Sequence, residues 1–488
     1  MIRQTDKYLL LFLLILGFLA GNAERSTANG QRPTANGQPP TDSIPVYQVH
    51  PFVIGTIYIT GNRVTRGFVI GRELPFKTGD TLTLEQIAKY FIDARDHLIA
   101  THLFNDVNVS LREFRGYMMD VSIDVKERWY IFPLPYVRPI DRNLTAWAET
   151  GFSLSRLDYG LKYSQYNVTG RNDNLRIWLI TGYSREIEMA YDRPNTGKNL
   201  VHGFGGGFLL SGLQELNVIT TNNQQVFINK DSIPNTGHYL QTRATYSLRY
   251  YYRPAIKTKH FFRLSFNQIK IDSSVLFYNP HYFLNNKLSI FYPELSYTIN
   301  YNNIDYVPYP TQGFLFEGGL TQRGFTADMN MTQLLAKTYE AFSFAPKMYF
   351  VSQDYGVLRV PFNQPFYNQQ LLGYADYYMR GLEKYVVDGV GLLLARNTVM
   401  RELASFNVPF LKQTSHDHIP FRIYAKTYFD VGYAFNKYYS MNSLQNTMLY
   451  SGGVGIDIVT FYDFVFRTEF SVNQLGEKGL FFHIRNDF

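Results

Sequence analysis

The chemistry open to the Arg380 guanidinium depends on where the surrounding chain places it. Arg380 lies in the stretch Met379-Arg380-Gly381-Leu382, inside a tyrosine-rich segment that runs from Leu371 to Asp388. On an exposed loop, an arginine beside a turn glycine would simply be solvated. If the segment folds into an enclosed space, the guanidinium needs a carboxylate partner, because burying an unpaired charge is costly. Downstream, Asp430 lies on the polar face of a segment in which apolar and polar residues alternate.

Patterns typical of catalysis or metal binding are missing from the sequence. It contains no Gly-x-Ser-x-Gly motif, no phosphate-binding glycine loop and no His-Glu-x-x-His motif. The absence of cysteine excludes a disulfide scaffold, a thiol nucleophile, a cysteine-ligated metal and a lipoprotein anchor. His416-Asp417-His418 precedes Pro420 and is typical of a turn, and two histidines are too few for a metal site. We therefore predict neither an enzyme nor a cofactor.

The composition favours many amphipathic strands. Aromatic residues make up 17% of the 488 residues, with 39 Tyr and 39 Phe, while the mean hydropathy is only -0.20. The lack of a long apolar run excludes a helical membrane bundle. The aromatic girdles of a membrane barrel would explain the Tyr and Phe excess, and a large soluble sandwich or propeller is the alternative. The formal net charge of +7 is small for this length, so nucleic acid is not an expected partner.

The first 49 residues predict export followed by a spacer. Arg3 and Lys7 precede an apolar run from Tyr8 to Ala20, which is too short to span a bilayer but suits a signal-peptide core. Gly21-Asn22-Ala23 supplies a small-x-small cleavage pattern, so residues 1–23 are the predicted signal peptide; a buried N-terminal helix is the alternative. Residues 24–49 contain a short repeat with interspersed prolines, which predicts a disordered linker.

Residues 50–128 have the pattern of a small α/β domain. Thr65 is placed to cap a short helix that ends before Pro75, and Thr83 with Gln86 forms a capping box for a longer helix. The spacing of apolar residues gives the longer helix one buried face, made of Ile87, Phe91, Ala94 and Leu98. With the flanking alternating segments, the predicted order is β-α-α-β-β, with the helices on one face of a small sheet.

Residues 129–488 carry repeated segments of alternating apolar and polar residues, among them 244–250, 421–430 and 464–471. Segments of this kind, separated by Asn, Gly, Pro and Asp turns, indicate a barrel with an apolar outer face and a polar inner face. A soluble sandwich also alternates, but it rarely combines so many Tyr and Phe with so much charge on the other face. The chain ends on a strand whose apolar residues are Leu480, Phe482, Ile484 and Phe488.

Several of these features resemble one family. Residues 50–128 resemble a POTRA domain in element order, in Gly61-Asn62 after the first strand and in Leu103-Phe104 before the second. The remainder resembles the barrel of the BamA/TamA-like outer-membrane assembly superfamily. Its lumenal loop carries a Val/Ile-Arg-Gly-Phe/Tyr tetrad, of which Met379-Arg380-Gly381-Leu382 keeps the Arg and Gly.

Other stretches are similar to further motifs of that superfamily. Phe429-Asp430-Val431-Gly432 is similar to the motif whose aspartate receives the loop arginine, so the resemblance pairs Arg380 with Asp430; an ordinary lumen-facing aspartate is the alternative. The turn Asp305 to Gly313, with Pro310, is similar to one that enters a barrel strand. Glu402, ahead of Pro409, is the candidate second acidic partner. Phe482, Ile484 and Phe488 resemble a C-terminal signal read by barrel-assembly machinery.

The resemblance implies an all-β transmembrane barrel of about sixteen antiparallel strands over residues 129–488. One small α/β POTRA-like domain over residues 50–128 would precede it, in the periplasm of a Gram-negative bacterium. The implied function is insertion or translocation of other proteins at the outer membrane, through a seam between the first and last barrel strands. Pro133, Pro135 and Pro139 fit a weakly hydrogen-bonded first strand.

The implied partners are unfolded outer-membrane or exported client proteins, periplasmic or lipoprotein partners, and outer-membrane lipid. Two other functions remain open from the sequence. One is a dedicated secretion or lipid-export pore, and the other is a passive outer-membrane channel.

Overall fold

The computed structural model describes residues 51–139, 151–197, 199–233, 239–374, 377–409, 418–437, 442–460 and 464–483. All of them belong to one structural unit, His50–Phe488. The predicted signal peptide and linker lie outside the described residues, as do His416, Asp417, Ile484 and Phe488.

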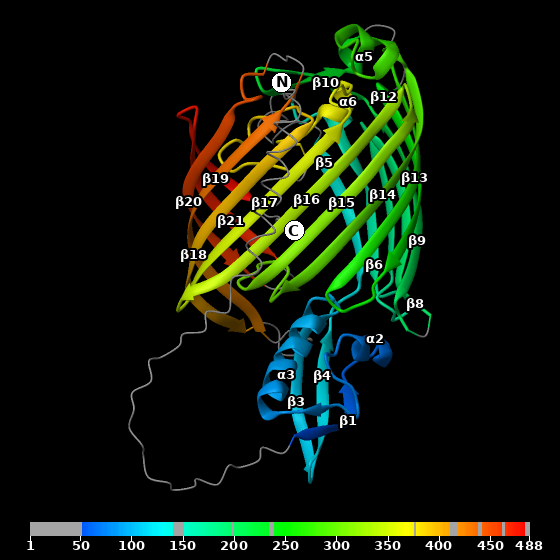
Figure 1. Cartoon of the computed structure of the whole chain (residues 1–488). Coiled ribbons are helices and arrows are strands. Elements are labelled where there is room, and N and C mark those ends of the chain that lie inside the picture. The colour runs from blue at the N-terminus through cyan, green and yellow to red at the C-terminus, as the bar shows by residue number, and fades with distance from the viewer. Residues whose placement is uncertain are drawn as a thin grey trace, which may run out of the picture. The chain divides into compact units, whose positions relative to one another are not determined.

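The N-terminal domain is a four-stranded sheet with two helices (Figure 1). Its elements are β1 Phe52–Thr60, α2 Gly67–Arg72, β2 Thr81–Leu82, α3 Leu84–Ile99, β3 Phe104–Arg115 and β4 Met118–Glu127. The strand order is β2-β1-β4-β3, in which β1 and β4 run parallel. This confirms the predicted β-α-α-β-β order and adds the two-residue strand β2.

Helix α3 forms where the sequence pattern places it. The Thr83 hydroxyl accepts a hydrogen bond from the Gln86 backbone N–H, and the Gln86 side-chain oxygen accepts one from the Thr83 backbone N–H, so the capping box is present. Ile87, Ala94 and Leu98 are buried in the domain core. The expectation for Thr65 is wrong, because Arg66 is the N-cap of α2 and no side chain caps that helix.

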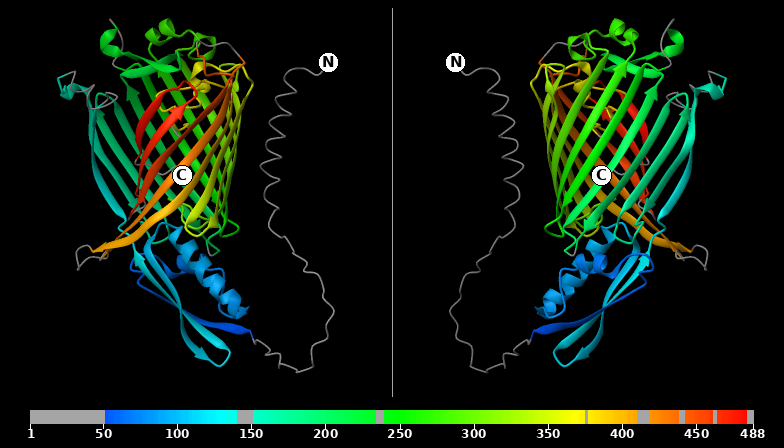
Figure 2. Two further views of the ribbon diagram at one scale, coloured as in Figure 1. Left: turned by 90° about the vertical axis from the view of Figure 1, so that its left-hand side faces the viewer. Right: turned by 90° about the vertical axis from the view of Figure 1, so that its right-hand side faces the viewer.

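The second part of the chain forms a sixteen-stranded antiparallel sheet, which Figures 1 and 2 show curled into a barrel. The sheet order follows the chain from β5 to β22, except that β9 pairs directly with β12. The strands are β5 Ile131–Pro139, β6 Leu157–Tyr166, β7 Asn174–Gly182, β8 Arg185–Thr196, β9 His202–Leu213, β12 Gln241–Tyr252, β13 Thr258–Ile271, β14 Ser289–Ile304, β15 Gly313–Thr326, β16 Met329–Ala345, β17 Met348–Val360, β18 Gly391–Pro409, β19 His418–Phe435, β20 Met448–Val459, β21 Val465–Asn473 and β22 Lys478–His483.

Short elements occupy several connections of the sheet. Between β9 and β12 lies the hairpin β10 Glu215–Thr221 and β11 Gln224–Asn229. The helices are α5 Ser273–Tyr278 and α6 Phe366–Gln369, with the 3-10 turns η2 Leu154–Arg156, η3 Lys230–Ser232 and η4 Leu284–Asn286. No helix among the described residues has both the length and the apolar character needed to cross a membrane.

The two faces of the sheet differ as the alternation predicts. On β19, Lys426, Tyr428 and Asp430 are buried, whereas Phe429 between them is 53% exposed. Large apolar side chains recur on the outer face of other strands, including Leu248 on β12 and Phe291 on β14. Successive strand residues point to opposite faces, so these observations give the barrel an apolar outside and a polar inside.

Candidate functional site

The segment between β17 and β18 folds back against the inner face of the barrel wall. Leu372 and Val387 exchange backbone hydrogen bonds of 3.0 and 2.8 Å, which close the segment on itself. Met379 and Leu382 are buried in a cluster with residues of the wall. The other members of this cluster are Tyr355, Val357, Leu371, Leu372, Val387, Leu392, Leu394, Ala434, Leu444 and Leu449. The apolar residues of the tetrad therefore hold the segment in place.

Gly381 meets two requirements that other residues would not. Its φ is +83°, in the left-handed region, and a Cβ there would lie 3.1 and 3.2 Å from the Cβ atoms of Ser471 and Ser451. This close approach lets the Ser451 hydroxyl donate to the Arg380 carbonyl. In the same way, Asn473 Nδ2 donates to the Gly381 carbonyl at 2.8 Å. The backbone of the tetrad is thus fixed to β20 and β21.

The structure brings Arg380 and Asp430 together. Arg380 Nη2 lies 2.5 Å from Asp430 Oδ1, and Nε lies 3.0 Å from Oδ2. The Arg380 backbone N–H also donates to Asp430, at 3.1 Å. The guanidinium lies over the Tyr428 ring, 4.0 Å from its centroid, and donates to Thr398 Oγ1 at 2.9 Å. With Asp430 fully buried and Arg380 3% exposed, this is a two-point charge-assisted contact away from bulk water.

A second arginine, Arg396, adjoins the pair and was not identified from the sequence. Arg396 is directly opposite Asp430 in the β18–β19 register, and its Nε lies 3.9 Å from Asp430 Oδ2. Its guanidinium also lies over the Tyr378 ring and donates to the Tyr378 hydroxyl at 3.2 Å. Asp430 is therefore shared by two buried guanidinium groups. Alternation on β18 could have shown that Arg396 faces inward.

A further buried ion cluster lies on β19, β20 and β21. Lys426 Nζ is 2.7 Å from Asp457 Oδ1 and 2.6 Å from Glu469 Oε1, and all three side chains are at least nine-tenths buried. Arg467 Nε lies 3.9 Å from Asp457. Tyr309, from the connection between β14 and β15, donates to Asp457 Oδ2 at 2.9 Å. Lys426 and Glu469 lie in the alternating segments 421–430 and 464–471, but alternation alone did not predict that they meet.

Tyr309 belongs to the turn that the sequence singled out. Asp305 closes this turn by accepting from the backbone N–H groups of Thr311 and Gln312, at 2.9 and 3.1 Å. Gly313 has φ +110°, and a Cβ there would collide with the Asn303 carbonyl. Pro310 lines a small cavity of about 40 Å³ together with Arg380 and Arg396. The turn therefore reaches the same inner region as the lumenal tetrad.

Glu402 is not a partner of Arg380, which corrects the expectation for this residue. Its carboxylate lies 3.3 Å from Lys347 Nζ and 3.5 Å from the Tyr424 hydroxyl. The β18 residue opposite Asp430 is Arg396, six positions before Glu402, and six residues of extended strand span about 20 Å. Alternation around Glu402 left its face ambiguous, and the strand register places it too far from Asp430.

The two remaining expected residues lie on opposite sides of the wall. Gly432 is on the inner face of β19, where a Cβ would lie 3.7 Å from Met379 Sδ. Its small size therefore leaves room for the lumenal segment. Phe482, on β22, is 69% exposed on the outer face, like Leu480 on the same strand.

The N-terminal domain is joined to the barrel by hydrogen-bonded contacts. Arg253, after β12, makes a two-point ion pair with Glu73, at 2.5 and 2.6 Å. Thr65 accepts from Asn167 Nδ2 at 2.8 Å and also contacts the Tyr130 hydroxyl. A cavity of about 1110 Å³ lies at this junction, lined by α3 residues that include Asp96 and by barrel residues. Burial raises the pKa of Asp96 to about 6.

Comparison with known proteins identifies the N-terminal domain. Residues 52–128 match the POTRA family model, described as a surface antigen variable number repeat. No curated protein sequence matches the chain.

Solved structures show a similar fold. CdiB from Escherichia coli is similar with a TM-score of 0.51 and 11% identity, over 89% of this chain and 74% of that one. BamA from Haemophilus ducreyi lacking POTRA domains 1–3 has a TM-score of 0.44 and 15% identity, over 88% of this chain and 83% of that one. For CdiB from Acinetobacter baumannii the values are 0.45 and 11%, over 88% and 72%. At 11% identity, the similarity to CdiB from Escherichia coli concerns the fold alone.

Proposed function

We propose that this POTRA-bearing barrel inserts other proteins into, or moves them across, the outer membrane of a Gram-negative bacterium. The observation that carries the proposal is the open seam of the sheet. Among the residues that the structure describes, β5 pairs with β6 and β22 pairs with β21, and no register joins β5 to β22. An unpaired strand edge is a ready template for an added strand, so this seam offers a place for a client strand to pair.

The composition of β5 supports this use of the seam. Pro133, Pro135 and Pro139 have the same parity within a nine-residue strand, so all three remove donors from the same edge. Tyr130, of the opposite parity, accepts from the Tyr166 backbone N–H on the β6 side, so the prolines face the seam and reduce the hydrogen bonds that can form across it.

The POTRA domain supplies a second edge for binding. In its sheet order β2-β1-β4-β3, strand β3 lies at an edge, and its far end, from Leu111 to Arg115, is exposed. We expect a client or partner segment to add to this edge before it reaches the barrel. The two-point Glu73–Arg253 pair would hold the domain beside the barrel during this transfer.

The docking of the lumenal segment against the barrel wall argues against a passive channel. The lumenal segment is fixed by apolar contacts at Met379 and Leu382 and by the buried Arg380–Asp430 pair. An open pore would gain nothing from anchoring a segment to four neighbouring strands. A dedicated export pore for one product remains the second candidate, because the seam and the POTRA edge would serve one exported client as well as many.

Crosslinking from defined strands tests the seam. A photo-crosslinking amino acid would replace Leu134 on β5 or Leu480 on β22, which are 56% and 57% exposed. Leu295, on β14 in the middle of the sheet and 51% exposed, is the matched control. Protein crosslinks from Leu134 and Leu480 but not from Leu295 are expected in living cells. Equal crosslinking from all three positions would refute a role for the seam.

Depletion of the protein then separates the candidate functions. Proteomics of the outer-membrane fraction should show the loss of many barrel proteins if the chain is a general assembly factor. Loss of a single exported product would instead identify a dedicated pore. An unchanged outer-membrane protein profile, together with no crosslinks, would overturn both and leave a channel.

A further inference from the structure

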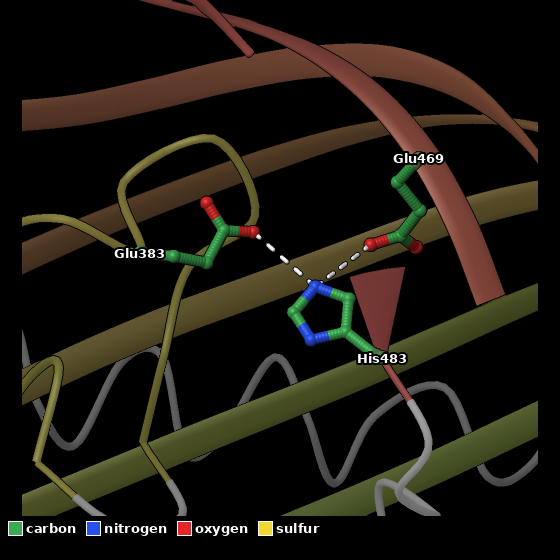
Figure 3. Close-up of side chains that lie close together, drawn as sticks. All are labelled: Glu383, Glu469 and His483. Carbon is green, nitrogen blue, oxygen red and sulfur yellow. Dashed lines mark ion pairs between the residues drawn. The ribbon is translucent and has the colours of Figure 1, made fainter. Parts of the chain in front are cut away.

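Three potential metal ligands converge inside the barrel near its C-terminal end (Figure 3). Glu383 follows the lumenal tetrad, Glu469 is on β21, and His483 is the last residue of β22. His483 Nε2 lies 3.6 Å from Glu383 Oε1 and 3.5 Å from Glu469 Oε2. The three ligand atoms all lie within 4.8 Å of one another. The lumenal segment and the neighbouring strands β21 and β22 thus direct an imidazole and two carboxylates to one point.

These atoms are buried but make no hydrogen bonds to one another. In the described part of the chain, neither Glu383 oxygen has a hydrogen-bond partner, and the same is true of Glu469 Oε2 and His483 Nε2. Separations of 3.5 and 3.6 Å exceed the usual length of an N–H···O bond. The Glu469 side chain is only 2% exposed, and leaving a buried carboxylate oxygen without a partner is costly. The three side chains therefore present ligand atoms without hydrogen-bond partners to one point.

We propose that Glu383, Glu469 and His483 bind one Zn²⁺ ion. Zinc binds imidazole nitrogen and carboxylate oxygen at about 2.0 to 2.2 Å in tetrahedral geometry, which places neighbouring ligand atoms about 3.3 to 3.6 Å apart. The separations of His483 Nε2 from the two carboxylate oxygens, 3.6 and 3.5 Å, fall in that range. An imidazole ligand favours zinc over magnesium or calcium, which prefer oxygen ligands alone. Three protein ligands leave one tetrahedral position for water.

The surroundings orient the ligands for this purpose. Lys426 Nζ holds the other oxygen of Glu469, Oε1, at 2.6 Å, which leaves Oε2 directed at His483. The Tyr378 ring packs beside the His483 ring, with centroids 5.7 Å apart. Lys426 thus fixes one carboxylate ligand in place and Tyr378 packs against the imidazole.

The ion would fasten the last strand of the barrel to the lumenal segment. Its ligands come from the segment after Gly381, from β21 and from β22, and β22 borders the open seam. The site rests on the positions of these three side chains and does not depend on the proposed function. Failure of client crosslinking would therefore leave the zinc proposal standing. Failure to bind zinc would likewise leave the proposed function standing.

Metal titration of the full-length protein tests the proposal. The protein would be purified in detergent with a histidine-free affinity tag, stripped with a chelator and titrated with Zn²⁺ against a chromophoric competitor. We expect one ion per chain, and we expect Co²⁺ to give the visible absorption bands of a tetrahedral site. His483→Gln and Glu383→Gln should each weaken binding by about tenfold or more, since even residues behind metal ligands have effects of this size.

His260→Gln is the matched control, because His260 lies on β13 and contacts the Tyr297 hydroxyl instead. It should leave the Zn²⁺ affinity unchanged, and mobility shifts on boiling should confirm that every variant is folded. Unchanged affinity in His483→Gln, or no binding at micromolar Zn²⁺, would overturn the proposal. Protease protection of β22 that follows pH without any metal binding would also overturn it, because a proton would then bridge the carboxylates.

Discussion

Removing Asp430 should damage the lumenal segment more than removing Arg380. Asp430 accepts from Arg380 and lies 3.9 Å from Arg396. Arg380→Ala leaves the buried carboxylate near Arg396, and the backbone N–H of residue 380 can still donate to it. Asp430→Ala leaves two buried guanidinium groups close together without their shared counter-ion. The two substitutions break the same pair but leave different charges behind.

The expected magnitudes follow from this difference. Breaking a buried ion pair costs about 3 to 5 kcal/mol. The free-energy cost of Arg380→Ala should be near the lower value, because Arg396 still partly neutralises the Asp430 carboxylate. The cost of Asp430→Ala should be near the upper value. A cost of about 3 kcal/mol raises the undocked population of the segment roughly 100-fold or more, since each 1.4 kcal/mol is a factor of about ten. The barrel should still form in both variants, because its strand ladders do not include the segment.

Native-state hydrogen exchange of peptides covering residues 371–390 measures the undocked population directly. Thermolysin cleavage gives a second measurement, and it is preferable to trypsin because Arg380→Ala removes a trypsin site. Glu402→Ala is the matched control, since Glu402 contacts Lys347 and not Arg380. It should leave exchange in the segment unchanged, and a shift in mobility on boiling should show that each barrel is intact.

Two results would refute this reasoning. Equal exchange in wild type and Asp430→Ala would show that the ion pair does not hold the segment. Recovery by the charge swap, Arg380→Asp with Asp430→Arg, would show that Arg396 does not control the charge balance at position 430. We expect the swap to fail, because the arginine placed at position 430 would face Arg396 and the backbone N–H of residue 380.

Three further predictions concern other contacts. Gly381→Ala should undock the segment by about 1 to 3 kcal/mol, because the alanine is strained at φ +83°, and the same exchange experiment measures this. Glu73→Gln should weaken the pair with Arg253 and speed proteolytic release of the POTRA domain, whereas Glu85→Gln on the exposed start of α3 should not. Burial raises the folded pKa of Asp96 to about 6, against about 3.9 when unfolded, so the folded domain binds the extra proton. The stability that Asp96 contributes to the folded domain is complete below about pH 3.9 and is lost as the pH rises through about 6. The melting temperature of the POTRA domain, followed by the signal of its helices, should therefore fall over this pH range. Asp96→Asn should abolish that fall.

Local patterns predicted the parts of the fold that depend on local geometry. Alternation assigned Phe429 to the outer face and Asp430 to the inner face because successive side chains of a strand point in opposite directions. The capping box located the start of α3 because its two hydrogen bonds join residues three apart. Thr65 lacked such a local constraint, and its hydroxyl instead contacts Tyr130 and Asn167 across the junction.

The register between strands, and with it the position of each residue along the barrel axis, could not be predicted in this way. A strand pattern gives the face of a residue but not the residue beside it on the next strand. Glu402 and Arg396 have the same parity on β18, and only the register shows that Arg396 is opposite Asp430. The sequence therefore supplied the correct arginine and aspartate through family resemblance, while it missed the second arginine that sets the charge balance.

Glycines on β20 explain how side chains of β19 reach β21. In the register, Tyr428 is opposite Gly453, which is opposite Ser471, and the Tyr428 hydroxyl lies 2.6 Å from Ser471 Oγ. A Cβ at Gly453 would lie 2.5 Å from that hydroxyl, so any larger residue would block the contact.

The same arrangement positions Glu469. Lys426, Gly455 and Glu469 occupy one row across β19, β20 and β21. A Cβ at Gly455 would lie 3.0 Å from Lys426 Cε and 3.2 Å from Glu469 Cγ. The missing side chain thus lets the lysine cross a whole strand and hold one oxygen of the carboxylate. Because that contact turns the other oxygen toward His483, a glycine on β20 helps to set the geometry of the zinc site proposed at β22.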